Sequence, residues 1–118
     1  MQISANGISL NYEVDGPDGA PWITFSNSLA ADLTMWDVQA EHFKDRYRVL
    51  RYDTRGHGKS EPLQGPYTLD MLAADVLALW EELKVTKSHF VGLSLGGMTA
   101  QCLALNNTNR LHSMAVCD

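Results

Sequence analysis

The sequence predicts an α/β fold in which helices cover a mostly parallel sheet. Two observations carry this prediction. A hairpin pattern opens the chain, and after it segments typical of buried strands alternate three times with segments of helical periodicity. Such alternation implies crossover connections between parallel strands, because antiparallel neighbours are usually joined by short turns. At this length we expect a single domain over residues 1–118.

The elements can be justified in order. Asn6-Gly7 lies between two short runs, Gln2–Ala5 and Ile8–Val14, and Asn-Gly is the pair that a two-residue hairpin turn prefers. We expect Thr34 and Thr68 to cap the first two helices, since each hydroxyl lies just before a helical pattern. The elements expected after the hairpin are the strand Trp22–Ser26, the helix Met35–Phe43, the strand Arg48–Asp53, the helix Leu69–Leu83, the strand Ser88–Leu93, the helix Leu95–Leu105 and the strand Leu111–Cys117.

Composition and charge exclude several classes of protein. The 118 residues are 45% hydrophobic and 19% charged, which argues against disorder, and the net charge of −5 argues against nucleic acid as a partner. The first residues lack a basic and an apolar region, and no apolar run is long enough for a membrane span. Cys102 and Cys117 form no Cys-x-x-Cys pair, so we expect free thiols and a cytoplasmic protein. We expect neither a metal nor a cofactor, because metal-ligand spacings and phosphate-binding glycine patterns are absent.

The chemistry-bearing motif is the pentad Gly92-Leu93-Ser94-Leu95-Gly96, a Gly-x-Ser-x-Gly sequence between a predicted strand and a predicted helix. In that context the serine sits on a sharp turn that exposes its hydroxyl, and the glycines remove side chains that would collide. We therefore predict Ser94 as a nucleophile, with the backbone N–H of Leu95 as a donor to a developing oxyanion. The alternative is that Ser94 only caps the helix.

Three segments together make the chain similar to the amino-terminal part of the α/β-hydrolases, and most similar to the 3-oxoadipate enol-lactonases. The segments are Ser26-Asn27-Ser28-Leu29 with Met35-Trp36, the run Arg48 to Gly58, and Gly92 to Met98. The resemblance implies a hairpin and a mostly parallel sheet without the lid and the carboxyl-terminal strands, so that residues 1–118 form a partial domain. It also implies hydrolysis of a small carboxylate-bearing lactone through an acyl-serine intermediate. A general esterase, and a non-catalytic fragment or assembly partner, remain as alternatives.

The resemblance implies further site residues. The loop after Ser26 would supply the second oxyanion donor, the backbone N–H of Ser28 or, one residue on, that of Leu29. Trp36 would line the mouth of the site, unless it is a core aromatic. Arg51 and Arg55 are candidates to bind the substrate carboxylate. Alternatively, Arg51 pairs with a neighbouring acid and Arg55 supports its loop through Asp53.

A serine nucleophile needs a histidine base, which in turn needs an orienting acid. The single histidine after Ser94 is His112, which opens the last strand and is expected at the opposite end of the sheet. His57 lies on the correct side, but in the family it supports its loop. Asp118 is a candidate acid at the end of the last strand. We therefore expect a homo-oligomer, an exchange of elements, or a complementing carboxyl-terminal fragment, with no nucleic-acid or membrane partner.

Overall fold

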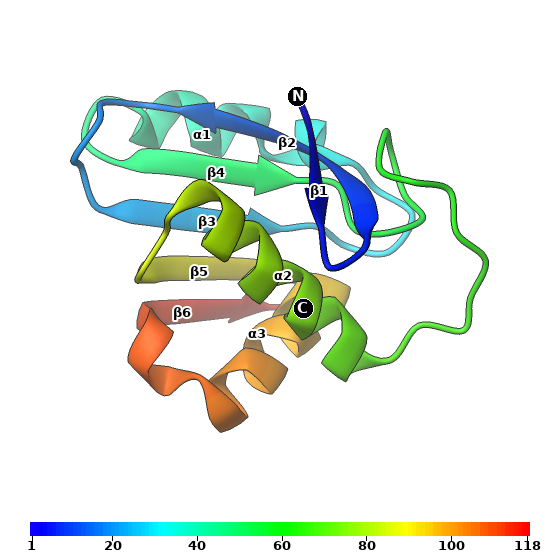
Figure 1. The fold of residues 1–118 in the computed structure, drawn as a ribbon. Coiled ribbons are helices and arrows are strands. Elements are labelled where there is room, and N and C mark those ends of the chain that lie inside the picture. Colours follow the sequence, from blue (N-terminus) through cyan, green and yellow to red (C-terminus); the bar gives the residue numbers. More distant parts are fainter.

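A computed structural model describes residues 1–118, and its centre is a six-stranded sheet with the order β1-β2-β4-β3-β5-β6 (Figure 1). β1 and β2 pair antiparallel, as do β2 and β4, whereas β4, β3, β5 and β6 run parallel. The strands are β1 Gln2–Ala5, β2 Ile8–Asp15, β3 Trp22–Ser26, β4 Arg48–Tyr52, β5 Ser88–Leu93 and β6 Leu111–Cys117; the α-helices are α1 Asp37–Phe43, α2 Leu69–Leu83 and α3 Leu95–Asn106. This arrangement confirms the predicted fold class.

The hairpin turn forms as the sequence predicts. Asn6 and Gly7 both have positive φ, at 54° and 76°, which is the backbone shape of a type I′ turn. A Cβ added at Gly7 would meet no atom within 4 Å, so the turn needs glycine for its backbone angles and not for space. β2 extends to Asp15, one residue beyond the predicted end.

The first helix differs from the prediction. Residues Leu33–Trp36 form a 3₁₀ turn, and α1 begins only at Asp37. The cap is Asp32, whose carboxylate accepts the backbone N–H of Thr34 at 2.9 Å, so the prediction of Thr34 as the cap is wrong. The carboxylate two residues upstream reaches the free N–H groups of the turn, while Thr34 already lies inside it.

α2 follows the predicted boundaries. Thr68 caps its start by accepting the backbone N–H of Met71 at 3.1 Å, and the residue after its end, Lys84, is a C-cap with a left-handed φ of 62°. Its buried residues include Leu72, Val76 and Leu79, as the helical spacing predicts.

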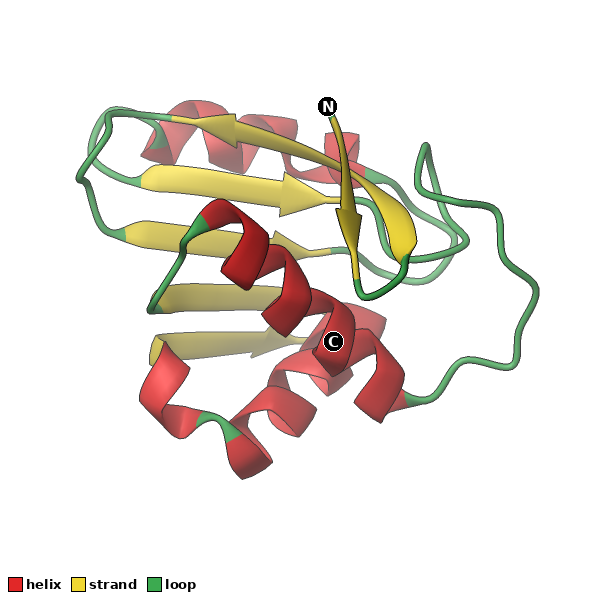
Figure 2. Ribbon diagram, viewed as in Figure 1, coloured by secondary structure: helices red, strands yellow, loops and turns green.

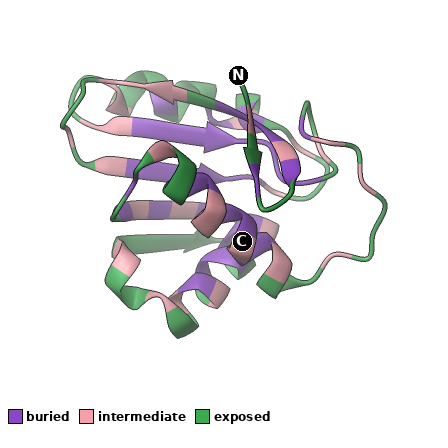
Figure 3. Ribbon diagram, in the orientation of Figure 1, coloured by how far each residue is buried: buried purple, intermediate pink, exposed green.

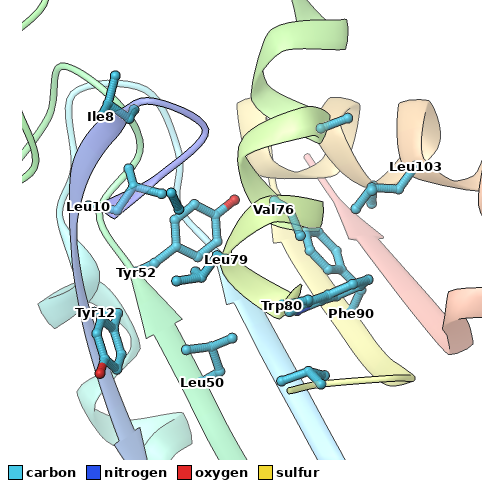
Figure 4. Packing of buried hydrophobic residues seen from close by; sticks show 14 residues of the cluster. Ile8, Leu10, Tyr12, Leu50, Tyr52, Val76, Leu79, Trp80, Phe90 and Leu103 are labelled. Atoms are coloured by element: carbon cyan, nitrogen blue, oxygen red, sulfur yellow. The ribbon is translucent and has the colours of Figure 1, made fainter. Parts of the chain in front are cut away.

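Helices cover the two faces of the sheet unequally (Figure 2). α2 and α3 enclose the main core, where Val76 and Trp80 of α2 meet Leu50 and Phe90 of the sheet (Figure 4). The rings of Trp80 and Phe90 meet edge to face, with centroids 6.1 Å apart. A smaller core lies on the other face beneath α1; its residues are Ile23, Phe25, Trp36, Ala40 and Val49.

β6 is the most exposed strand of the parallel part (Figure 3). It pairs with β5 alone, in a register that places Leu93 beside Cys117, and its other edge has no partner strand. Met114 and Val116 each leave 42% of their surface exposed. None of the helices has both the length and the apolar composition needed to cross a membrane.

Candidate active site

Ser94 lies at a sharp turn between β5 and α3, as the sequence predicts. Its φ of 53° and ψ of −108° form a left-handed conformation that side chains rarely adopt. Its side chain is exposed and makes no capping hydrogen bond to the helix that follows. The alternative of Ser94 as a simple helix cap therefore has no hydrogen bond to support it.

The glycines of this turn, which we call the elbow (Gly92–Gly96), are required by close backbone contacts. A Cβ on Gly92 would lie 2.2 Å from the carbonyl oxygen of Gly96, and a Cβ on Gly96 would lie 2.2 Å from that of Ser26. The first contact closes the turn between β5 and α3, and the second holds the start of α3 against the end of β3. The elbow consequently packs directly against the end of β3, which brings the loop after β3 beside Ser94.

Two backbone N–H groups near the elbow are available to a ligand. Leu95 is the first residue of α3, and the N–H groups of a first helical turn have no acceptor within the helix. In the loop after β3 (residues 27–32), the N–H of Ser28 donates to the Met35 sulfur at 3.5 Å, whereas that of Leu29 donates to no group of the chain. Of these two loop N–H groups, only that of Leu29 has no acceptor within the chain.

Trp36 lies in the core and not at the mouth of the site. It is 7% exposed, and its ring packs on Phe25 with centroids 4.9 Å apart. Its indole N–H donates to the side-chain oxygen of Asn27 at 2.9 Å. The alternative of a core aromatic fits this packing, and the prediction of a substrate-lining residue does not.

Arg51 is surrounded by carboxylates of the chain itself. Its guanidinium is 2.8 Å from Glu13, 3.3 Å from Asp15 and 2.6 Å from Asp37, and the residue is buried. The alternative in which Arg51 pairs with neighbouring acids therefore accounts for its side chain.

Arg55 is likewise committed to an ion pair. Its Nε and Nη2 donate to the two oxygens of Asp75 on α2 at 2.7 and 2.8 Å, and this hydrogen bonding raises the pKa of Arg55. The carboxylate also accepts a hydrogen bond from the Asn6 side chain at 2.8 Å. The partner is thus Asp75 and not the expected Asp53, because α2 lies over the loop that carries Arg55.

Asp118 directly follows the residue that contacts the elbow. The backbone N–H of Ser94 donates to the carbonyl oxygen of Cys117 at 2.8 Å. Asp118 therefore lies at the same edge of the sheet as Ser94, and its side chain is exposed. It makes no hydrogen bond to any histidine.

The histidines do not hydrogen-bond to Ser94. His57 lies on the loop after β4, with Nδ1 3.0 Å from the Arg55 carbonyl oxygen. His89 and His112 lie together near the amino-terminal ends of β5 and β6, with ring centroids 5.0 Å apart, at the end of the sheet away from Ser94. His42 is exposed on α1. No group of three or more potential metal ligands occurs.

Two buried polar side chains that hold the loops near Ser94 were not among the predicted site residues. Buried Asp53 accepts the backbone N–H groups of Leu33 and Lys59, both at 2.8 Å, and so joins the loops after β3 and β4. A signal was present: Gly58 follows closely, and a Cβ there would lie 2.3 Å from the Asp53 carboxylate. Asn27 is the second, and its fully buried amide had no signal in the pattern of the sequence.

Ser94 lines none of the cavities of the chain. One of about 430 Å³ lies between α2 and α3 and is lined by Leu69, Met98 and Leu105. Another of about 410 Å³ lies at the opposite end of the sheet, beside Trp22 and Arg48. None of these cavities therefore encloses the Ser94 side chain.

Comparison with known proteins agrees with this geometry. Residues 21–118 match the family model described as the alpha/beta hydrolase fold. The 3-oxoadipate enol-lactonase 2 of Acinetobacter baylyi is 42% identical over 114 residues, which are 97% of this chain and 43% of the relative. The enol-lactonase from Burkholderia xenovorans LB400 superimposes with a TM-score of 0.93 at 46% identity, covering 97% of this chain and 45% of the other.

A hydrolase from Pseudomonas aeruginosa superimposes equally well, with a TM-score of 0.94 at 44% identity, over 98% of this chain and 44% of the other. The chain spans less than half the length of the relatives that it matches. The matched region includes the elbow, the loop after β3 and the whole parallel sheet. On this fold and this family match, the chain belongs to the α/β-hydrolases.

Proposed function

We propose that the chain carries the nucleophile of a serine hydrolase that opens a small lactone or ester. One observation carries the proposal: Ser94 is held at positive φ at the strand-to-helix turn, with an exposed side chain that makes no capping hydrogen bond. A serine that served only the fold would be expected to use its hydroxyl as the cap or to avoid this strained conformation. The strain is consistent with a hydroxyl presented for attack.

The proposed reaction has two steps. The Ser94 oxygen bonds to the substrate carbonyl carbon while the hydroxyl proton passes to a base. The oxyanion that forms accepts hydrogen bonds from the backbone N–H groups of Leu95 and of the loop after β3. The ring C–O bond then breaks, and in an enol-lactone the departing enolate takes a proton and becomes a ketone. Water hydrolyses the acyl-serine, which releases the carboxylate and restores Ser94. We assign the second donor to Leu29, because the N–H of Ser28 is directed at Met35.

We propose that the base comes from outside residues 1–118, since none of the histidines here hydrogen-bonds to Ser94 or lies at the elbow. Asp118 is the candidate for the orienting acid. Its position supports this role, because the preceding residue already accepts the Ser94 N–H. An acid there would have to contact a histidine from the same outside segment.

The substrate class is proposed from the relatives. The relatives at 42% and 46% identity are enol-lactonases, which supports 3-oxoadipate enol-lactone or a similar carboxylate-bearing lactone. The carboxylate needs a cation, and the ion pairs of Arg51 and Arg55 argue against either of them in that role. A general esterase is the alternative within the same chemistry. The two free thiols support action in the cytoplasm.

We further propose that a second polypeptide segment covers β6, equivalent to the part of the relatives beyond the matched region. The exposed edge of β6 and its uncharged strand residues support this, because an unprotected edge readily pairs with another strand. A second copy of the chain, or an exchange of elements between copies, is the competing occupant of the same edge. Without such a segment the chain would lack the base, and would then be a non-catalytic fragment or assembly partner.

The test is hydrolysis by two proteins, the 118-residue chain and a chimera in which it replaces the matched region of the Burkholderia enol-lactonase. Each is assayed with 3-oxoadipate enol-lactone and a chromogenic acetate ester, beside its Ser94→Ala variant. The proposal expects Ser94-dependent turnover of the lactone by the chimera and little turnover by the chain alone. A folded chimera whose activity is absent, or is unchanged by Ser94→Ala, overturns the proposal. Ser94-dependent turnover by the chain alone overturns the external base.

A further inference from the structure

The loop after β3 is tied at its start by one buried side chain. Asn27 is fully buried, and its amide makes two hydrogen bonds in opposite directions. Its Nδ2 donates to the carbonyl oxygen of Tyr52, the last residue of β4, at 2.9 Å. Its Oδ1 accepts the indole N–H of Trp36 at 2.9 Å. The amide therefore joins the loop to the neighbouring strand on one side and to the 3₁₀ turn on the other.

This amide can take only one orientation. A flip would direct its NH₂ group at the indole N–H, donor against donor, and its oxygen at the Tyr52 carbonyl, acceptor against acceptor. The indole is itself fixed, because Trp36 is 7% exposed and packs on Phe25. An unmade hydrogen bond at a buried amide is costly, so Trp36 dictates how Asn27 enters the loop.

The rest of the loop has few anchors of its own. Its far end is held where Asp53 accepts the Leu33 N–H at 2.8 Å. Between the two anchors, Leu29 is 68% exposed, and Ser28 contacts only the weakly accepting sulfur of Met35. The direction of the Leu29 N–H therefore depends on the anchor at Asn27, two residues away.

We propose that Trp36 and Asn27 are positioning residues for oxyanion stabilisation. Through Asn27, the Trp36 indole sets the place of the Leu29 N–H beside Ser94, although neither side chain touches substrate. This inference rests on the proposed function, which gives the loop its role. The required precision is high, since a displacement of about 1 Å at a catalytic group can cost roughly a hundredfold in rate.

Trp80 provides a matched control. Its indole N–H also donates to a buried oxygen, the Thr24 hydroxyl, at 3.1 Å, and its ring is fully buried. It belongs to the core cluster between the sheet and α2, however, and that cluster includes no residue of the loop after β3. Replacement of either tryptophan by phenylalanine removes one buried indole hydrogen bond, but only Trp36→Phe removes one that holds the loop.

The experiment compares Trp36→Phe with Trp80→Phe. Loop motion is measured in the 118-residue chain, and labelling is measured in the chimera with the Burkholderia relative, which supplies the base. Two quantities are measured: the ¹⁵N order parameters of Ser28 to Ala31, and the rate at which a fluorophosphonate labels Ser94. For Trp36→Phe we expect the order parameters to fall from about 0.85 toward about 0.6, and the labelling rate to fall about tenfold or more. For Trp80→Phe we expect both to stay near the wild-type values. Asn27→Ala should lower the order parameters and the labelling rate as Trp36→Phe does. It takes the place of Trp36→Phe in the comparison if that variant does not fold.

The outcomes separate this inference from the proposed function. Equal order parameters in the two tryptophan variants overturn the inference, whatever the labelling shows. A mobile loop in Trp36→Phe with an unchanged, Ser94-dependent labelling rate also overturns it, because the loop then does not serve the reaction. A wild-type chimera that is not labelled at Ser94 counts against the proposed function, while the order parameters of the 118-residue chain still decide whether Trp36 holds the loop.

Discussion

The backbone N–H of Ser94 donates to the carbonyl oxygen of Cys117 at 2.8 Å, so the end of β6 supports the elbow directly. On its other side the elbow rests on β3, where Gly96 meets the carbonyl oxygen of Ser26. The strained serine is thus held between two strands that lie far apart in the sequence. Its conformation depends on the assembled sheet and not on the pentad alone.

Gly96→Ala should destabilise the chain by roughly 1–3 kcal/mol, because the new Cβ would lie 2.2 Å from a backbone oxygen that cannot yield. Gly97→Ala is the matched control on the same helix. Its Cβ would meet Cγ1 of Val116 at 2.9 Å but backbone oxygens only at 3.3 Å and beyond, so we expect a smaller loss of stability. Urea unfolding of both variants measures the difference. Equal losses would contradict the close contact between Gly96 and β3.

Arg55→Met should lower the free energy of unfolding by about 3–5 kcal/mol, because it leaves the carboxylate of Asp75 buried without its counter-charge. The double variant Arg55→Met/Asp75→Leu removes both charges, and should be more stable than the single one. Chemical denaturation measures the free energy of unfolding of the single and the double variant. A single variant of wild-type stability would mean that Arg55 is free to serve a ligand.

Stability should fall in mild acid through His89. Burial, and then the charge of His112, lower the pKa of His89 from its ordinary value of 6.5. Between the folded pKa and 6.5, His89 is largely protonated in the unfolded chain but largely neutral in the folded chain. The contribution of His89 to the free energy of unfolding is therefore full above pH 6.5. It declines as the pH falls toward the folded pKa and levels off below that pKa.

Urea midpoints across this range should show a weaker pH dependence in His89→Gln than in the wild-type chain. His42→Gln, on the exposed surface of α1, is the control and should keep the wild-type profile. If His89→Gln keeps that profile as well, the shift assigned to His89 is wrong.

Ala115→Lys should weaken any association through β6. Ala115 is exposed and pairs with Val91, on the part of the sheet that α1 leaves uncovered, so a charge there opposes burial beneath a second segment. Gln39→Lys on α1 makes the same change in net charge at an unrelated surface. Light scattering at micromolar concentration, with and without the carboxyl-terminal part of the Burkholderia relative, measures the association. A wild-type chain that associates with neither itself nor that part contradicts the proposed role of β6.

Most of the fold could be predicted because its signals are local. The Asn-Gly turn, the Thr68 cap and the spacing of Leu72, Val76 and Leu79 each depend on residues close in the sequence. The first helix was harder, since Asp32 outcompetes Thr34 as a cap only once the chain bends after β3.

For the candidate site, too, local patterns could be predicted and contacts between separate elements could not. Ser94 and Leu95 belong to a pattern of five residues, and the structure places them at the predicted turn. Arg51, Arg55 and Trp36 depend on partners far along the chain, and their side chains turned to Asp37, Asp75 and Asn27. No spacing rule gives such pairings, because they arise when separate elements meet in the sheet.

The most direct test of Ser94 as the nucleophile is the site at which an active-site-directed fluorophosphonate modifies the chimera with the Burkholderia relative, read by intact mass and peptide mapping. We expect a single adduct on Ser94 and none in Ser94→Ala, although Ser28 lies in the adjoining loop and other serines are present. A label on another serine, or equal labelling of Ser94→Ala, would contradict Ser94 as the nucleophile.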